Sequence, residues 1–455
     1  MRSYRKTGYA GIVAFAVATL AAAGCSSSSS TTSATTPSST AAAPSSSAAA
    51  PSSSAPTPSA SVTTGGLGAQ SVTDYLSYTG GKAGKADNTM APVTIGFVNQ
   101  QGGPQVIGQH ATDGAEMAVN YINKELGGVD GHPVQLSTCF IASAEEEGNG
   151  CAQKFLANKS IDVIAMGAVV IGDQSFYATL GGKLPVVGGV APLPIDGAQK
   201  NTAVLFGDAT SVLGPFGTYG RDVLHAKTAA VLYPNTASAT PGALATEAAL
   251  KSAGISVKMG PYPENATDLT GVLASTGAAT ADMVVPAVAA PDCVNIQKAF
   301  TQQGITDPKK IVAAPLCLNG QVAAGLGGDF PKWTYLIASS LFGDTTDPGM
   351  IEYMKLAQTY STPANAPDPW NIVDFGQMMT IDKVLNQVGF ANLSPSAIQS
   401  AVQAFKGPQA LGAPALECGY DPAAPGVCNN RSQFFEYEGK NKWVKTDGWI
   451  QPPTG

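Results

Sequence analysis

The residues best suited to covalent chemistry in this sequence are its seven cysteines, and their spacing divides them into two kinds. Six fall into three close pairs separated by long gaps: Cys139 with Cys151, Cys293 with Cys317, and Cys418 with Cys428. An even number of cysteines in an oxidising compartment is typical of disulfides, and we expect these local pairs among the fifteen connectivities that six cysteines allow. The seventh, Cys25, has no partner in this pairing scheme.

A metal site is the alternative interpretation of these cysteines. No pair has the two-residue spacing of a zinc knuckle. The histidines, His110, His132 and His225, accompany none of the pairs. We therefore expect no metal and no cofactor.

Enzyme signatures are also missing. The segment "GDQSF" around Ser175 lacks the G-x-S-x-G form of a nucleophile elbow. The segment "GLGGDF" at 325–330 lacks the third glycine of a dinucleotide fingerprint and the helix that should follow it. The sequence thus favours a protein that is not an enzyme.

Cys25 follows a basic segment, "MRSYRK", and an uncharged apolar run from Gly8 to Ala23. This order is typical of a secretory signal. A transmembrane anchor is the alternative, but the run of about 16 residues is shorter than the roughly 20 that span a bilayer. The segment "AAGC" resembles the lipobox of bacterial lipoprotein precursors, except that Ala22 replaces the usual leucine. The resemblance implies a signal peptide over 1–24 and acylation of Cys25, by palmitate among other chains.

Residues 25–65 are serine, alanine, threonine and proline except for Cys25, Val62 and Gly65, with hardly any large apolar side chain. Such a segment cannot bury enough surface to offset its chain entropy, so we expect a disordered tether.

Removing Arg2, Arg5 and Lys6 with the signal leaves 22 basic against 32 acidic residues. This balance argues against nucleic acid as a partner. We expect an extracytoplasmic protein held at the cell membrane by lipid.

From residue 93 onward, short apolar runs alternate with amphipathic segments. The first series predicts strands at 93–98, 134–140, 162–167 and 185–190, with helices at 113–126, 145–158 and 174–183. The second predicts strands at 228–234, 255–263, 281–289 and 309–315, with helices at 242–254, 269–278 and 293–304. Two further helices, 347–361 and 375–389, precede a hairpin within 432–450. Strands alternating with helices indicate an α/β fold with doubly wound sheets.

The run "VTIGFVNQQGGPQVIGQHATDGAEMAVNYINKELGGVDGHPVQL" resembles the opening of the branched-chain amino acid type of ABC-transporter solute-binding proteins. Further matches keep the same order, among them "IDVIAMG", "KLPVVGG", "AAVLYPN" and "ADMVVPAVAAPDCVNIQKAFTQQG". The resemblance covers about 93–450. It implies the periplasmic binding protein-like fold of type I: two Rossmann-like lobes joined by three crossovers, which close on a ligand by hinge motion.

The resemblance also implies how the chain divides. An N-terminal extension would occupy 66–92, lobe 1 would comprise 93–206 and 340–432, and lobe 2 would comprise 207–339 and 433–455. The crossovers would lie near 206–211, 337–344 and 432–437. The implied function is a monomeric solute receptor that delivers a small molecule to the permease of an ABC importer. A sensor or scaffold lipoprotein with the same fold is the alternative.

Amino-acid binders of this family hold the ligand with hydroxyls, an aromatic and an acid, and this sequence departs from that pattern. "AVVIGDQS" and "GVAP" stand where the hydroxyl-bearing turns are expected, Ser238 stands at the tyrosine, and Ala289 replaces a second aromatic. The acid expected after "KKIVAAP" is absent from "LCLNG". A buried ammonium without a carboxylate would cost several kcal/mol. The expected ligand is therefore a less polar amide or carboxylate, with an amino acid as the alternative.

The expected ligand-binding residues combine apolar side chains with a few groups that form hydrogen bonds. They are Gln100, Gln101, Gln105, Gln109, Val169, Val170, Asp173, Val190, Asn235, Ser238 and Ala289. For the glutamines a solvated loop is the alternative, and for Asp173 the alternative is a helix cap.

Overall fold

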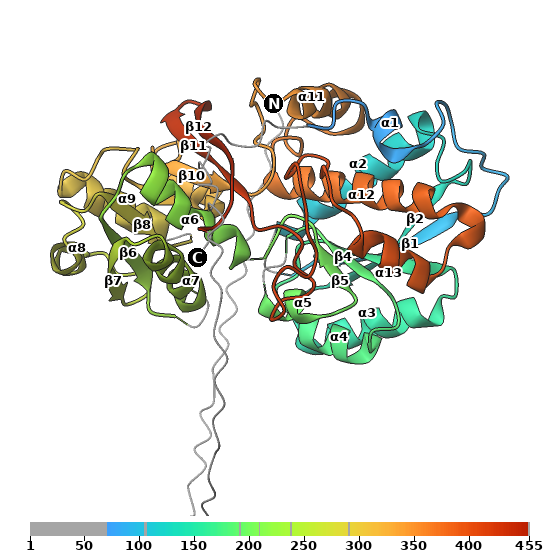
Figure 1. The fold of residues 1–455 in the computed structure, drawn as a ribbon, viewed down its shortest axis with the longest axis horizontal. Helices are drawn as coiled ribbons and strands as arrows, with labels where there is room; N and C mark the ends of the chain where they lie inside the picture. Colours follow the sequence, from blue (N-terminus) through green and yellow to red (C-terminus); the bar gives the residue numbers. More distant parts are fainter. Residues whose placement is uncertain are drawn as a thin grey trace, which may run out of the picture. The chain divides into compact units, whose positions relative to one another are not determined.

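The computed structural model describes residues 71–103, 107–190, 193–208, 210–236, 239–289 and 292–453. The expected signal peptide, Cys25 and the expected tether lie outside these residues, as do Gln105 and Ser238. The described chain is an α/β fold with two groups of strands, each covered by its own helices (Figure 1). We refer to the first sheet with its helices as lobe 1 and to the second as lobe 2.

Lobe 1 contains a parallel sheet with the strand order β2-β1-β3-β4-β5. The strands are β1 (Val93–Gln100), β2 (Val134–Ile141), β3 (Ile161–Met166), β4 (Val186–Gly188) and β5 (Thr202–Val204). Along β1, Ile95 and Phe97 pack into one hydrophobic cluster while Val98 packs into another. Both faces of β1 are therefore buried, which is why most of this strand reads as an apolar run.

Helices cover both faces of this sheet. They are α2 (Ile107–Glu125), α3 (Glu145–Ala157), α4 (Asp173–Leu180), α5 (Pro194–Ala198), α11 (Pro348–Tyr360), α12 (Pro369–Val388) and α13 (Pro395–Gln403). The helices α2 and α12 lie side by side (Figure 1). They approach closely at Gly114, where a Cβ atom would overlap the backbone carbonyl of Asn371. Gly114 thus sets the spacing of the two longest helices.

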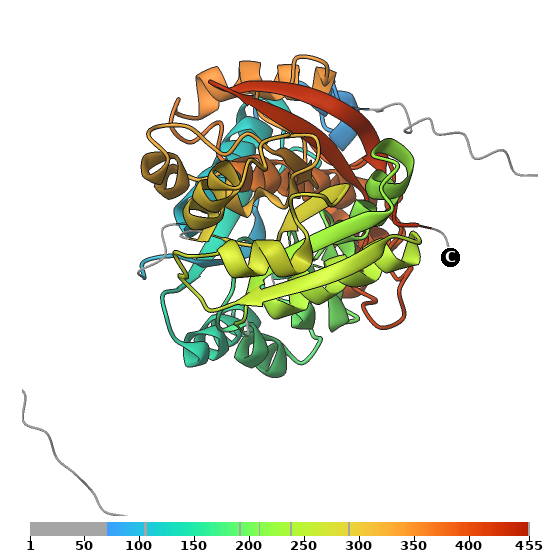
Figure 2. The ribbon, with the colours of Figure 1, turned by 90° about the vertical axis from the view of Figure 1, so that its left-hand side faces the viewer.

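Lobe 2 is built from a parallel group of strands and a mixed group. The first has the order β7-β6-β8, with β6 (Thr228–Pro234), β7 (Ser256–Tyr262) and β8 (Met283–Pro286). The second has the order β12-β11-β10-β9, with β9 (Val312–Ala313), β10 (Thr334–Ile337), β11 (Ser432–Gly439) and β12 (Lys442–Ile450). A parallel bridge between Val284 and Ile311 brings β8 next to β9. Figure 2 shows β11 and β12 as a long hairpin in red.

The helices of lobe 2 are α6 (Pro215–Thr218), α7 (Thr240–Ser252), α8 (Thr270–Thr276), α9 (Asp292–Gln302) and α10 (Gly320–Gly325). A π-helical turn, Tyr219–Val223, follows α6. Short 3-10 turns occur at Ser211–Leu213, Pro315–Cys317 and Phe390–Asn392.

Three segments that connect the lobes are hydrogen-bonded to one another. Asn429 Nδ2 donates to the carbonyl of Phe206 at 3.2 Å, and Ser432 Oγ donates to the carbonyl of Val212 at 3.0 Å. Gln433 Nε2 donates to the carbonyl of Ser339 at 3.2 Å. The chain therefore crosses between the sheets at three adjoining places, in agreement with the expected architecture.

The segment before β1 is part of lobe 1. Asp74 caps the short helix α1 (Tyr75–Thr79) by accepting from the Ser77 N–H at 3.1 Å. The Tyr78 hydroxyl lies 2.9 Å from Thr380 Oγ1 of α12, and Lys383 Nζ lies 4.7 Å from the centre of the Tyr78 ring. The sequence did not reveal this contact, because a single turn of helix carries too little periodicity to read.

Disulfides join the cysteines in the same three pairs that we expected from the sequence. The Cα atoms are 5.5 Å apart for Cys139 and Cys151, 5.7 Å for Cys293 and Cys317, and 3.8 Å for Cys418 and Cys428. The first bond ties β2 to α3 in lobe 1, and the second ties the start of α9 to the loop after β9 in lobe 2.

Candidate functional site

The expected ligand residues follow the carboxyl ends of the strands, where α/β sheets place their binding crevices. Gln100 ends β1 and is buried. Its Oε1 accepts from the Val170 N–H at 2.9 Å, and its own N–H donates to the Ala168 carbonyl at 3.1 Å. Gln100 therefore holds the loop after β3 in place, which is a positioning role.

The next glutamines form a chain of hydrogen bonds at the start of α2. Gln101 Nε2 donates to Gln109 Oε1 at 2.7 Å, and Gln101 Oε1 accepts from the Thr112 hydroxyl at 2.6 Å. Gln109 Nε2 donates in turn to Asp113 Oδ1 at 2.8 Å. Gln101 is half-buried and Gln109 is exposed. Both amides are accessible, but a ligand would have to compete with these internal bonds.

The two expected valines in the loop after β3 differ in how far their side chains are exposed to solvent. Val169 is 1% exposed and packs into the cluster beneath the sheet, whereas the Val170 side chain is 41% exposed. Val190, after β4, is partly buried against the core. Val170 is therefore the apolar side chain of lobe 1 that is most open to a ligand among the three expected valines.

Two buried carboxyl groups lie beneath these loops, Asp173 in the first turn of α4 and Asp196 in α5. Neither side-chain oxygen of Asp173 has a hydrogen-bond partner among the described residues, and its exposed fraction is 0%. Asp196 Oδ2 accepts from the Leu193 N–H at 3.3 Å. Burial raises the pKa of both groups, and the charge of Asp196 raises that of Asp173 further. The pair therefore retains a proton near neutral pH, and Asp173 lies inside the lobe.

Lobe 2 contributes exposed groups at the ends of two strands. Asn235 follows β6 and is exposed, with its N–H donating to the Tyr262 carbonyl at 2.7 Å. Ala289 follows β8 and is also exposed. Both remain candidates for ligand contact.

Sequence reasoning missed Leu316, which follows β9 and has an exposed fraction of 58%. It lies in the 3-10 turn Pro315–Cys317, between a proline and a fully buried cysteine. The absence of an acid from "LCLNG" was visible in the sequence, but the exposure of this leucine was not. Single exposed apolar side chains are common on protein surfaces, so it is the position of Leu316 after β9, and not its exposure alone, that makes it a candidate for ligand contact.

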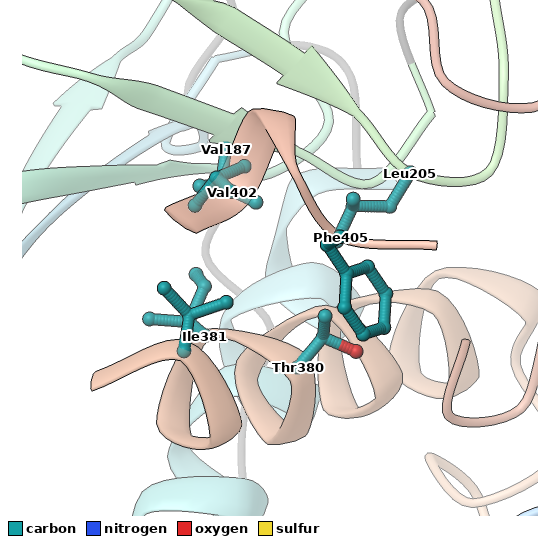
Figure 3. A pocket seen from close by; sticks show the side chains of 7 residues that line it. Val187, Leu205, Thr380, Ile381, Val402 and Phe405 are labelled. Carbon is teal, nitrogen blue, oxygen red and sulfur yellow. The ribbon is translucent and has the colours of Figure 1, made fainter. Parts of the chain in front are cut away.

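A small hollow inside lobe 1 is separate from these residues. Figure 3 shows its lining side chains, which come from β4, α12 and α13 and from the residues that follow β5 and α13. They are Val187, Leu205, Thr380, Ile381, Val384, Val402 and Phe405. The space does not admit a water molecule, so it is a packing defect and no ligand site.

The described residues contain no group of three or more histidine, cysteine, aspartate or glutamate side chains placed to hold a metal ion. None of the helices in these same ranges combines the length and apolar character that crossing a bilayer requires.

Residues 92–419 match the family described as periplasmic binding protein. The chain belongs to this family. The resemblance seen in the sequence is thereby confirmed, and an extracytoplasmic location is implied, because members of the family bind solutes outside the cytoplasm. A comparison with curated proteins gave no match.

Solved structures share the fold of this periplasmic binding protein at low sequence identity. An ABC transporter substrate-binding protein from Sphaerobacter thermophilus has a TM-score of 0.64 and 14% identity, over 79% of this chain and 98% of the other. LivJ from Streptococcus pneumoniae, in complex with isoleucine, has a TM-score of 0.56 and 15% identity, over 78% and 99%. A solute-binding protein from R. palustris, in complex with 4-hydroxybenzoate, has a TM-score of 0.60 and 16% identity, over 80% and 98%.

Proposed function

We propose that this periplasmic binding protein is the solute receptor of an ABC importer and captures an apolar carboxylic acid or amide between its lobes. The observation that carries the proposal is the pair Val170 and Leu316. They are exposed apolar side chains at the carboxyl ends of strands, one in each lobe. Apolar walls with a few polar groups are typical of sites for such ligands.

The ligand class follows from what an amino acid would need. Its ammonium group requires a carboxylate partner once water is excluded. Leu316 lies in the segment where family members that bind amino acids carry that acid. Asp173 is buried within lobe 1 and is protonated in part, so it is a poor substitute. Proteins of the same fold bind isoleucine in one case and 4-hydroxybenzoate in another, and the exposed side chains here favour the second kind.

Benzoate and 4-hydroxybenzoate should raise the melting temperature of the protein, and isoleucine should not. A ligand at a hundred times its dissociation constant adds about 2.7 kcal/mol to the unfolding free energy. Val170→Asp should weaken binding of benzoate at least tenfold, because it removes apolar contact and places a negative charge near the ligand. Isothermal titration calorimetry measures both effects.

The matched control for this substitution is Val444→Asp. Val444 is similarly exposed, at 39%, but lies on β12, away from the carboxyl ends that form the proposed site. Its replacement should leave benzoate binding unchanged. Binding of isoleucine in place of the aromatic acids, or equal losses in both variants, would count against the proposed ligand class.

We further propose that acylated Cys25 anchors the protein to the membrane. Cys25→Ala should then release the protein into the medium, whereas Ser26→Ala should leave it with the membrane fraction. Partition into detergent followed by immunoblotting measures the distribution. An alanine variant that still partitions into detergent would contradict the lipid anchor.

A further inference from the structure

The disulfide between Cys293 and Cys317 connects two loops at the carboxyl ends of strands in lobe 2. Cys293 lies in the first turn of α9, after β8, and Cys317 ends the 3-10 turn after β9. Both side chains have an exposed fraction of 0% and belong to the hydrophobic core of this lobe. The covalent bond therefore joins the two loops on their buried side, within the core of lobe 2.

Each end of this bond lies next to an exposed residue. Leu316 directly precedes Cys317. On the other side, the N–H of Cys293 donates to the carbonyl of Ala289 at 3.2 Å. The disulfide thus connects the backbones that present Ala289 and Leu316, both of which face solvent at the proposed ligand site.

Other restraints on Leu316 are mostly local. The preceding strand β9 has two residues, and the turn that carries Leu316 has three. The turn is closed by the Leu318 N–H donating to the Pro315 carbonyl at 2.9 Å. Asn319 Nδ2 donates to the Leu316 carbonyl, also at 2.9 Å. These bonds maintain the shape of the turn, whereas the disulfide ties it to the loop after β8.

We propose that the Cys293–Cys317 disulfide is a positioning element of the ligand site, which holds Leu316 as a preformed apolar wall of lobe 2. The proposal rests on the proposed function. A side chain held in its bound position before the ligand arrives loses little conformational entropy on binding, which favours affinity. Leu316 would then determine which ligands fit, and the disulfide would act through it.

The test is a double-mutant cycle on the full protein with 4-hydroxybenzoate as the probe. It compares Cys293→Ala/Cys317→Ala, Leu316→Ala and the triple variant by calorimetry. Alanine is chosen because serine would leave hydroxyl groups in the buried cluster. Removing the disulfide should weaken binding about tenfold when Leu316 is present and less than threefold when it is absent. A merely structural disulfide would instead give the same loss in both backgrounds.

The matched control is Cys139→Ala/Cys151→Ala, which removes a disulfide of lobe 1 that connects β2 to α3. It should change the affinity less than twofold. Equal affinity of the Cys293/Cys317 variant and the wild type, or equal losses in both disulfide variants, would overturn the proposal. If the Cys293/Cys317 variant does not fold, Pro315→Gly loosens the same turn with the disulfide intact. It should weaken binding about threefold, and unchanged affinity would likewise overturn the proposal.

Hydrogen exchange separates this inference from the proposed ligand class. The amide of Leu318, whose N–H donates to the Pro315 carbonyl, should exchange at least tenfold faster in Cys293→Ala/Cys317→Ala, while those of β8 should stay protected. Unchanged exchange at Leu318 would overturn the positioning role, whether or not a ligand is bound. A wild type that binds no aromatic acid but shows the expected exchange would instead contradict the proposed ligand class alone.

Discussion

Replacing Asp173 by asparagine should stabilise the protein, and the gain should grow as the pH rises from about 4 to about 8. Burial raises the pKa of Asp173 to about 8 in the folded chain, from 3.8 when it is unperturbed. Between these values the unfolded chain releases a proton that the folded chain retains, so the wild type loses stability as the pH rises. Asparagine has no such proton to retain.

The expected gain is close to zero at pH 4 and up to about 5 kcal/mol at pH 8, since the two pKa values differ by about four units and one unit corresponds to about 1.4 kcal/mol. Urea unfolding of both proteins at several pH values measures it. The groups that share the site are Asp196, Glu145, Tyr177 and Asp208, and they are unchanged in the variant. Asparagine also offers Nδ2 as a hydrogen-bond donor to the neighbouring Asp196.

Asp268→Asn is the control with the opposite sign. Asp268 is exposed at the start of α8, and hydrogen bonds from the Thr270 backbone and hydroxyl lower its pKa. Its stabilising effect is present above the unperturbed pKa and lost as the pH falls. Replacing it should therefore reduce stability at pH 8 and have less effect near pH 3. A pH-independent difference for Asp173→Asn would show that the buried carboxyl is not protonated in the folded chain.

Gly114→Ala and Gly150→Ala should change stability in opposite directions, although both place a methyl group on a helix. At Gly114 the new Cβ atom would overlap the Asn371 carbonyl and lie 2.9 Å from its Cα atom. Because backbone cannot move aside as a flexible side chain can, α2 and α12 must separate, at a cost of about 1–3 kcal/mol.

Gly150 lies on the exposed side of α3, where a Cβ atom would meet no other atom within 4 Å. Alanine there should add about 0.5–1 kcal/mol, because glycine loses more backbone entropy in a helix. Chemical denaturation of the two variants compares them directly. A stabilised Gly114→Ala variant would mean that the two helices are not packed as closely as described.

Part of the fold could be predicted because β1 and β6 are long, mostly apolar strands with both faces buried. β1, β2, β6 and the C-terminal hairpin were located within a few residues. The expected strands at 281–289 and 309–315 were too long, since β8 and β9 occupy only Met283–Pro286 and Val312–Ala313. The helix expected at 113–126 begins earlier, at Ile107, because its polar first turns carry no apolar periodicity.

Elements of a few residues escaped prediction altogether. Four elements, β5, β10, α1 and α5, have three to five residues each. They are too short to show the apolar periodicity of a helix or of a strand. The nine-residue helix α13 was also missed, although Ser394 caps it and Pro395 begins it.

Exposure within the candidate site was the least predictable quantity. Val169 and Val170 are neighbours of the same type, yet the turn after β3 buries the first and exposes the second. Leu316 is exposed, whereas the next residue is buried and bonded to Cys293, 24 positions earlier in the sequence. Local patterns cannot report such constraints, since they depend on contacts between distant segments.

The packing of α1 against α12 also has a mechanical meaning. The Tyr78 hydroxyl contacts Thr380, and Lys383 Nζ donates to the Tyr78 carbonyl at 2.7 Å, so the chain enters the fold on lobe 1. Lobe 2 is joined to that point of attachment through the three crossovers. A pull on the N-terminal segment would therefore load lobe 1 first. In a protein anchored by its N-terminus, lobe 1 would stay in place during lobe closure and lobe 2 would move.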